Sequence, residues 1–469
     1  MQAAPSNAAS LDQWLAYIEG IHPVGIEMGL TRVRTVAERL QLLPFNCPVI
    51  TVAGTNGKGS SCALLESIYA AAGYKTGLYS SPHLVHFQER CRIGGESVAA
   101  DDLARAFAQV EDARLQAPAI SLSYFEYTTL ACLLLLYAAK LDVAILEVGL
   151  GGRLDAVNIV DTDCAIVTSI DIDHVEYLGG DRESIGREKA GIFRANKPAI
   201  VGDPMPPQSI LQIARELGVD LWQMGVDFNF SGDQQQWAWA GRRDSAPSTA
   251  AETPNANTSG SEQAGLPNAK RLGGLAYPAL RGANQLLNAS GVLAAVQAMR
   301  EHIPVTAQAI RQGLAAVELP GRFQIIAGQP AVVLDVAHNP HSVAALAANL
   351  DAMGFYPCTH GVFGVMADKV LEPMLAKMNP LVDKWYFCDL PTPRALPSAE
   401  IEKQWQVGNS RKDATSTCHA NPQAALDAAF AAAQPGDRIV VFGSFYTVGG
   451  VLANGMPRPP APHLPQTAH

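Results

Sequence analysis

The segment TVAGTNGKGS, residues 51–60, has the residue types and spacing that most clearly favour chemistry. The common phosphate-binding loop is spelled G-x-x-x-x-G-K-[ST]. Here Val52 stands where its first glycine belongs, and Gly59 rather than Ser or Thr follows Lys58. Backbone N–H groups at the start of a following helix could still bind an anion, with Lys58 beside the β- and γ-phosphates of ATP or GTP. The alternative is a tight strand-to-helix turn whose glycines serve only packing. The lysine and the strand–helix context favour the nucleotide loop.

Three polar residues at the ends of other predicted strands could hold a divalent cation beside the nucleotide. Ser81 ends the run GLYSS, Glu147 interrupts the apolar run VAILEVG, and His174 follows the next strand in IDIDHVEYLG. A carboxylate at the end of an apolar strand is costly unless it is paired or bound to metal, and hard cations take oxygen ligands. Taken alone, Ser81 would be an ordinary turn residue and His174 a loop histidine.

Apolar runs bounded by Gly, Asp or Pro predict the strands that position these residues. Unbroken apolar strands separated by helices indicate parallel sheets covered on both faces. The expected fold class is α/β, with a P-loop-type, mostly parallel sheet in residues 1–320 and a smaller Rossmann-like α/β domain in residues 321–469. The first series of strands is expected at 49–53, 75–80, 143–149, 164–170 and 197–203, and the second at 331–340, 360–366, 384–390 and 438–444.

Composition restricts the class of protein. The chain has 469 residues, of which 48% are hydrophobic, and a formal net charge of −10, which argues against a nucleic-acid-binding face. Residues 1–10 lack the apolar core of a signal peptide, and the longest apolar run, 128–139, is too short to span a bilayer. The 8 cysteines form no C-x-x-C pair, which favours reduced thiols. We therefore expect a cytoplasmic protein. The polar stretch 241–268 is expected to be a disordered insertion.

Eight motifs that occur in order along nearly the whole chain carry a family resemblance. They are GTNGKGS, YSSPHL, EVGLGGRLDAVNIV, TSIDIDHVEYLG, REKAGIF, LPGRFQ, DVAHNPHS and GSFYTV. Together they resemble the folylpolyglutamate synthase/dihydrofolate synthase branch of the Mur ligase family. GTNGKGS alone indicates only a Mur-type ligase, whereas its KGS ending and LPGRFQ with DVAHNP point to the folate branch. The resemblance also accounts for the loop's spelling, as the family's own variant.

The resemblance implies a nucleotide and metal site. The residues that match ATP contacts are Thr55, Asn56, Gly57, Lys58, Gly59, Ser60, Asn284, Arg322, Asp335 and His338. Those that match Mg²⁺ ligands are Ser81, Glu147 and His174, joined by Lys189, which the family carries as N6-carboxylysine and which would help to hold a second Mg²⁺ ion. Catalysis is thereby expected to involve Lys58, His174 and Lys189.

Simpler roles stand beside these. Asn284 could cap a helix, Asp335 and His338 could form a turn, and Lys189 alone would be a solvated helix residue.

The resemblance also implies a binding site for a pterin substrate. Aromatic rings can stack on a flat heterocycle, and a carboxylate can accept its ring N–H groups. The alternative for the segment SYFE, residues 123–126, is that it forms the capped start of the helix that contains the apolar run 128–139, and both roles are compatible. The matching residues are Ile26, Glu27, Met28, Ser123, Tyr124, Phe125, Glu126, Leu154, Asp155 and Ala156.

The implied activity is an ATP-dependent acid–amino-acid ligase. It would add L-glutamate to dihydropteroate, giving dihydrofolate, and to reduced folates, in both cases through an acyl phosphate. The expected partners are these small molecules and ATP, without nucleic acid or membrane, for a monomeric enzyme. Three alternatives stand beside it: a folylpolyglutamate synthase without dihydropteroate activity, a peptidoglycan Mur ligase with a UDP-binding domain ahead of the loop, and a P-loop switch without ligase chemistry.

Overall fold

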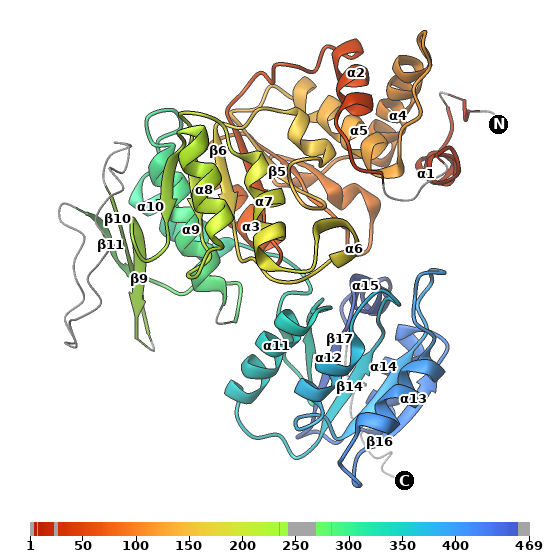
Figure 1. The fold of residues 1–469 in the computed structure, drawn as a ribbon. Coiled ribbons are helices and arrows are strands. Elements are labelled where there is room, and N and C mark those ends of the chain that lie inside the picture. Colours follow the sequence, from red (N-terminus) through yellow and green to blue (C-terminus); the bar gives the residue numbers. More distant parts are fainter. Residues whose placement is uncertain are drawn as a thin grey trace, which may run out of the picture. The chain divides into compact units, whose positions relative to one another are not determined.

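The computed structural model describes residues 4–6, 8–22, 27–233, 235–242, 269–282 and 284–457, and Figure 1 shows its ribbon. The chain forms two compact units. The first comprises Met1–His83, Gln88–Ala279 and Asn284–Glu318, and the second comprises Leu84–Phe87, Leu280–Ala283 and Leu319–His469. Within the insertion expected at 241–268, residues 243–268 lie outside the described residues, while Gly241 ends a strand. No helix in the described ranges is long and apolar enough to cross a membrane.

The first unit is built on an eight-stranded sheet of order β4-β3-β2-β5-β1-β6-β7-β8. The six strands from β2 to β8 in that order pair in parallel. Strands β3 and β4 add an antiparallel edge. The predicted P-loop-type, mostly parallel sheet is therefore confirmed. The strands are β1 (Val49–Ala53), β2 (Thr76–Tyr79), β3 (Cys91–Ile93), β4 (Glu96–Ser97), β5 (Val143–Glu147), β6 (Cys164–Val167), β7 (Pro198–Val201) and β8 (Asp220–Gln223).

Helices cover this sheet in separate groups (Figure 1). One group, α3, α9 and α10, packs together, and α3 also contacts β1, β2 and β5. In another group, α1, α2 and α4 pack around α5, whose apolar residues are mostly buried. The helices are α1 (Leu11–Gly20), α2 (Thr31–Arg39), α3 (Lys58–Ala71), α4 (Ala100–Leu115), α5 (Tyr124–Ala138), α6 (Val175–Leu178), α7 (Arg182–Lys189), α8 (Gln208–Leu217), α9 (Asn284–Ala298) and α10 (Ala307–Ala316).

A three-stranded antiparallel sheet, not expected from the sequence, belongs to the same unit. It is formed by β9 (Phe228–Gly232), β10 (Trp237–Gly241) and β11 (Lys270–Leu275). Alternate residues of β10 are buried, and the indole of Trp239 donates a hydrogen bond to the carbonyl of Ser290 on α9 at 3.1 Å. This contact ties the small sheet to the helix that also packs against α3.

The second unit has a six-stranded sheet of order β12-β13-β17-β14-β15-β16, parallel except for β12. Alternate strand residues point to opposite faces. Thus Val333 and Val440 belong to a core that includes residues of α11, α12 and α13, while Val332 and Ile439 belong to one with α14 and α15. The expected Rossmann-like architecture is confirmed. The elements are β12 (Gln324–Ile326), β13 (Ala331–Leu334), β14 (Thr359–Phe363), β15 (Lys384–Cys388), β16 (Thr415–His419), β17 (Arg438–Phe442), α11 (Pro340–Ala352), α12 (Leu371–Met378), α13 (Ser398–Gly408), α14 (Pro422–Ala432) and α15 (Phe445–Leu452).

A buried polar network joins α1, α4 and α5 in the first unit. The carboxylate of Glu111 accepts hydrogen bonds from the hydroxyls of Tyr17 at 2.9 Å and Tyr127 at 2.7 Å. It also pairs with Arg114 at 2.6 Å. Because α5 begins with the residues expected to contact a pterin, this network fixes the helix that presents them.

We predict that Glu111→Ala lowers the free energy of unfolding by about 3 kcal/mol, because it leaves a largely buried guanidinium without its carboxylate. Arg105→Ala, on the same helix, removes an exposed ion pair with Asp102 and should cost less than about 1 kcal/mol. Urea unfolding followed by circular dichroism measures both. Equal effects would contradict a structural role for the network.

Candidate active site

The β1–α3 loop has a backbone that only glycine allows at two positions. Gly54 has φ of +151° and Gly57 has φ of +90°, a region that disfavours L side chains. A Cβ on Gly54 would overlap the hydroxyl of Thr168, and one on Gly57 would overlap the carboxamide of Asn288. The unusual spelling of the loop therefore has a steric cause, since its first glycine is needed at 54 rather than at 52.

The residues that follow β6 hold this loop in place. The N–H of Thr55 donates to the carbonyl of Ser169 at 2.7 Å, and its hydroxyl donates to the carbonyl of Asp171 at 3.0 Å. The hydroxyl of Thr168 donates to the carbonyl of Asn56 at 2.7 Å. The loop is thus fixed before the first turn of α3, whose N-terminus favours an anion.

Two lysines converge on the carbonyl oxygen of Gly54. The Nζ of Lys58 donates to it at 3.0 Å, and the Nζ of Lys189 donates to it at 2.9 Å. Lys189 is only 3% exposed, which contradicts its interpretation as a solvated helix residue. Burial, reinforced by the charge of Lys58, lowers the pKa of Lys189 to about 7. A large fraction of its amine is therefore neutral at physiological pH.

The expected metal ligands lie at one edge of the sheet. Strands β2, β5, β1 and β6 are neighbours in that order. Ser81 follows β2, Glu147 ends β5, and His174 follows β6. The buried carboxylate of Glu147 accepts a hydrogen bond from the backbone N–H of Ser81 at 3.2 Å. A carboxylate and a hydroxyl at this edge are donors of the hard type that suits Mg²⁺.

His174 lies between β6 and α6. Its φ of 51° is unusual for a residue other than glycine, a type of strain that clusters at functional sites. Its Nε2 lies 4.0 Å from a carboxylate oxygen of Asp173, an acidic neighbour that sequence reasoning missed. In the described part of the chain, Glu147 and His174 do not form a compact cluster with a third His, Cys, Asp or Glu.

Several residues expected to bind a pterin come together in the first unit. The N–H of Gly29, next to Met28, donates to the carbonyl of Leu154 at 3.2 Å. The ring of Phe125 lies against Gly149, where a Cβ would overlap it. Asp155 begins the short helix Ala156–Ile159. Ile26 lies outside the described residues.

The carboxylates of Asp155 and Glu126 already accept hydrogen bonds from backbone N–H groups. Burial raises the pKa of Asp155 to about 6, and its carboxylate accepts the N–H groups of Leu150 at 2.8 Å and Val157 at 3.0 Å. Glu126 and Ser123 form a capping box at the start of α5, which confirms the helix-cap interpretation. Glu126 also pairs with Arg32 at 3.1 Å, and Glu27 pairs with the same guanidinium. The carboxylate of Glu126 is therefore largely engaged.

The three nucleotide-binding candidates of the second unit gather at the carboxyl ends of β13 and β17. The guanidinium of Arg322 lies 4.9 Å from the ring centre of Phe445, and the ring of His338 lies 6.0 Å from the same ring. Asp335 accepts the N–H groups of Phe323 at 2.9 Å and Ala337 at 2.8 Å. Burial raises the pKa of Asp335 to about 6, with Arg322 opposing the shift. Sequence reasoning missed Phe445, although GSFYTV contains it.

Near Asn284, two other residues of α9, Gln285 and Asn288, contact α3 and the loop before it. Asn284 begins α9. Asn288, one turn further, lies against Gly57, and its amide donates to the carboxamide oxygen of Gln285 at 3.1 Å. Gln285 in turn donates to the hydroxyl of Ser60 at 3.3 Å. The i, i+3 spacing of two carboxamides in NQLLN was the available signal, since it places both on one helix face.

The lowered pKa of Lys189 generates a stability prediction. Below about pH 7 the folded chain pays the full cost of burying a charged amine. That cost falls as pH rises toward the ordinary lysine value of about 10.4, because the unfolded chain then holds a proton that the folded chain has released. The unfolding free energy of the wild type relative to Lys189→Met should therefore rise by a few kcal/mol between about pH 7 and pH 10.

Urea unfolding in buffer free of carbon dioxide measures this difference. Lys75→Met, at an exposed lysine of the same unit, supplies the baseline. A difference between wild type and Lys189→Met that stays constant over this pH range would contradict the buried neutral amine.

Comparison with known proteins identifies the class. The Mur ligase middle domain matches residues 52–237, and the Mur ligase, glutamate ligase domain matches residues 321–445. The chain thus has the domains of a Mur ligase, an ATP-dependent ligase. Within that class it belongs to the dihydrofolate synthase/folylpolyglutamate synthase family. A relative of that name from Escherichia coli is 43% identical over 96% of this chain and 97% of its own length. One from Haemophilus influenzae is 36% identical over 93% and 96%.

Solved structures agree with this assignment. The E. coli FolC structure in complex with DHPP and ADP has a TM-score of 0.84 and 42% identity, over 96% of this chain and 99% of that chain. A Yersinia pestis bifunctional enzyme complexed with AMPPNP and Mn ion has a TM-score of 0.82 and 41% identity, over 96% and 99%. The Mycobacterium tuberculosis folylpolyglutamate synthase complexed with ADP has a TM-score of 0.80 and 28% identity, over 97% and 100%.

Proposed function

We propose that this ligase adds L-glutamate both to dihydropteroate and to reduced folates, through an acyl-phosphate intermediate. The observation that carries the proposal is a set of contacts between the candidate pterin segments, in the unit that holds the Gly54 loop. Gly29, next to Met28, donates to the carbonyl of Leu154, and Arg32 pairs with both Glu27 and Glu126. Relatives support it, since FolC was solved with DHPP and ADP, and a bifunctional enzyme was solved with Mn, AMPPNP and L-glutamate.

In the first step a substrate carboxylate attacks the γ-phosphate of ATP, and ADP leaves. Lys58 would turn from the Gly54 carbonyl to the phosphates, where its charge offsets the charge on the transferring group. Ser81, Glu147 and His174 would hold Mg²⁺, whose chemistry is to polarise phosphoryl oxygens and neutralise their charge. Arg322, Asp335 and His338 would add ATP contacts from the second unit. The amine of glutamate then attacks the acyl phosphate, a tetrahedral intermediate collapses, and phosphate leaves.

Lys189 would act as a carboxylated side chain. Its neutral amine, favoured by a pKa of about 7, has the lone pair needed to attack carbon dioxide. The N–C bond forms, one C–O π bond opens, and the amine proton passes to solvent. The product is an anion beside Lys58, and the two opposite charges attract each other. Its oxygens would then be suitable ligands for a second Mg²⁺ ion.

We predict that Lys58→Ala lowers kcat/KM by at least about 100-fold with an unchanged circular dichroism spectrum, because the phosphoryl charge loses a fixed partner. Lys75→Ala removes a lysine at the amino end of β2 and should leave turnover near the wild-type value. The assay is release of ADP that depends on both glutamate and an acid substrate. Near-full activity in Lys58→Ala would remove the loop from the mechanism, and ATP turnover indifferent to glutamate would favour a switch.

The second activity is tested separately with each acid. Phe125→Ala should raise the KM for dihydropteroate by about tenfold or more, since one aromatic contact is lost, and should affect a reduced folate less. Phe45→Ala, at a partly exposed ring that precedes β1, is the matched control. Equal losses for both acids would count against a dedicated pterin site.

No activity with dihydropteroate in the wild type would favour a folylpolyglutamate synthase alone. That is the name of a relative from Lacticaseibacillus casei, which is 31% identical over 75% of this chain and 79% of its own length.

A further inference from the structure

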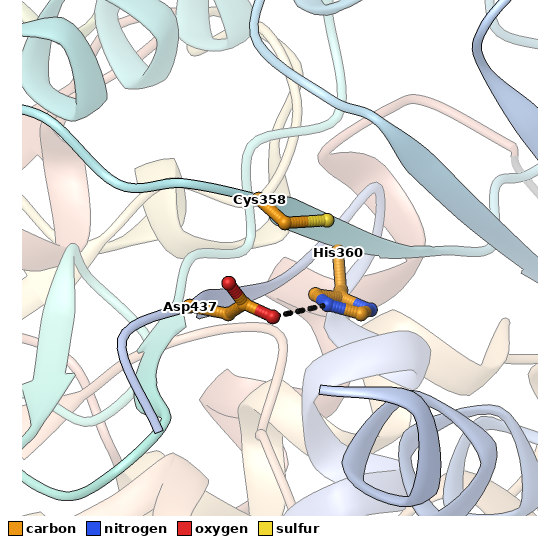
Figure 2. Close-up of side chains that lie close together, drawn as sticks. All are labelled: Cys358, His360 and Asp437. Atoms are coloured by element: carbon orange, nitrogen blue, oxygen red, sulfur yellow. Dashed lines mark hydrogen bonds and ion pairs between the residues drawn. The ribbon is translucent and has the colours of Figure 1, made fainter. Parts of the chain in front are cut away.

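A second group of metal-binding residue types lies in the second unit, away from its nucleotide-binding candidates. Cys358 and His360 flank the start of β14, and Asp437 immediately precedes β17 (Figure 2). These strands run parallel to β13, whose opposite end carries Asp335 and His338. The group therefore lies at the amino edge of the sheet, and the ligase chemistry does not use it.

The geometry of the group suits a tetrahedral ion. One ligand atom from each of the three side chains lies within 4.8 Å of the others. The Nε2 of His360 is 3.3 Å from Oδ2 of Asp437, which is long for a charge-assisted hydrogen bond. Two ligands bound to Zn²⁺ at about 2.0–2.1 Å, at tetrahedral angles, are separated by about 3.3 Å.

His360 is already oriented for ligation through Nε2. Its Nδ1 lies 3.0 Å from the hydroxyl of Tyr386, and the two rings stack at 5.8 Å. A partner on the second ring nitrogen is what a metal-ligating histidine ordinarily has, because it fixes the tautomer and the ring plane. Burial lowers the pKa of His360, which keeps the imidazole neutral and its lone pair available.

The carboxylate of Asp437 is buried beside His360. Its side chain is 5% exposed, its Oδ2 lies 3.3 Å from Nε2 of His360, and it accepts a hydrogen bond from the N–H of Gln434 at 2.7 Å. Arg438, its neighbour, instead donates to the hydroxyl of Thr359 at 2.9 Å and lies over the ring of Tyr356. Among the described residues no Lys or Arg forms an ion pair with Asp437, and such a carboxylate is costly to bury.

We propose that Cys358, His360 and Asp437 bind one Zn²⁺ ion, with water as the fourth ligand. Cys358 is partly exposed, which gives the ion and the water access. On binding, the S–H bond of Cys358 breaks, its proton passes to solvent, and a sulfur–zinc bond forms. One thiolate and one carboxylate then balance the two charges of the ion. Cysteine and histidine together select Zn²⁺ over Mg²⁺.

The test uses the full chain, stripped with a chelator and then dialysed. Zn²⁺ is titrated against a competing indicator, and Co²⁺ is added separately because a cobalt–thiolate bond gives a charge-transfer absorption band. We expect one tightly bound Zn²⁺ per chain and a cobalt–thiolate band. Cys358→Ser should lose the band and weaken Zn²⁺ binding by at least about 100-fold, and Tyr386→Phe should weaken it by about tenfold.

Cys418→Ser is the matched control, since it removes an exposed thiol from β16 of the same unit. It should bind Zn²⁺ and Co²⁺ as the wild type does. Circular dichroism establishes whether each variant is folded. If Cys358→Ser does not fold, the weaker Zn²⁺ binding expected of Tyr386→Phe still tests the site. A wild-type chain without the cobalt–thiolate band would overturn the proposal and leave His360–Asp437 as a hydrogen-bonded core pair. Equal Zn²⁺ affinity in wild type and Cys358→Ser would overturn it as well.

Discussion

The carbonyl oxygen of Gly54 is the point on which the candidate active site depends. It accepts hydrogen bonds from the side-chain nitrogens of Lys58 and Lys189, which come from two different helices. Burial, and after it the nearby charge of Lys58, lowers the pKa of Lys189 to about 7, so a large fraction of its amine is neutral near physiological pH. The same glycine has no room for a side chain, because Thr168 fills that space. Steric and electrostatic constraints therefore act on one residue of the loop.

Sheet order explains why residues far apart in the sequence share a site. In a parallel sheet the carboxyl ends of all strands meet at one edge. The order β2-β5-β1-β6 brings Ser81, Glu147 and the Gly54 loop to that edge, and His174 lies in the segment that follows β6. The second unit obeys the same rule with Asp335 and His338. Its opposite edge, free of that chemistry, carries the Cys358 group.

Much of this was predictable from the sequence. The strand 49–53 coincides with β1, because its five residues are buried and four of them are apolar. The glycines of the loop indicated a tight turn, and Gly54 and Gly57 have the positive φ angles that such a turn uses. Strands β9 to β11 were not expected, since the alternation of apolar and polar residues in them is short and residues 243–268 separate β10 from β11 in the sequence. Strand β4, two exposed residues long, carries no apolar signal at all.

The parts of the site that escaped prediction depend on tertiary contacts. Nothing local in REKAGIF indicates that Lys189 is buried beside Lys58. Asn288 has a role only because α9 packs against α3. Glu126 satisfied both the helix-cap and the site interpretation in sequence, and only the contact with Arg32 shows how its carboxylate is used. The spacing of residues along the chain predicts which side chains share a helix face or follow a strand. Which charged groups are buried, and which lie close together, can be seen only in the folded structure.

The central claim is that Lys189 carries a neutral amine at physiological pH, and direct titration tests it. Lysines labelled with carbon-13 at the ε position report protonation by NMR, and Lys189→Met assigns the signal. The account predicts a midpoint near pH 7 for Lys189 in buffer free of carbon dioxide. A midpoint near the ordinary lysine value of about 10.4 would contradict it.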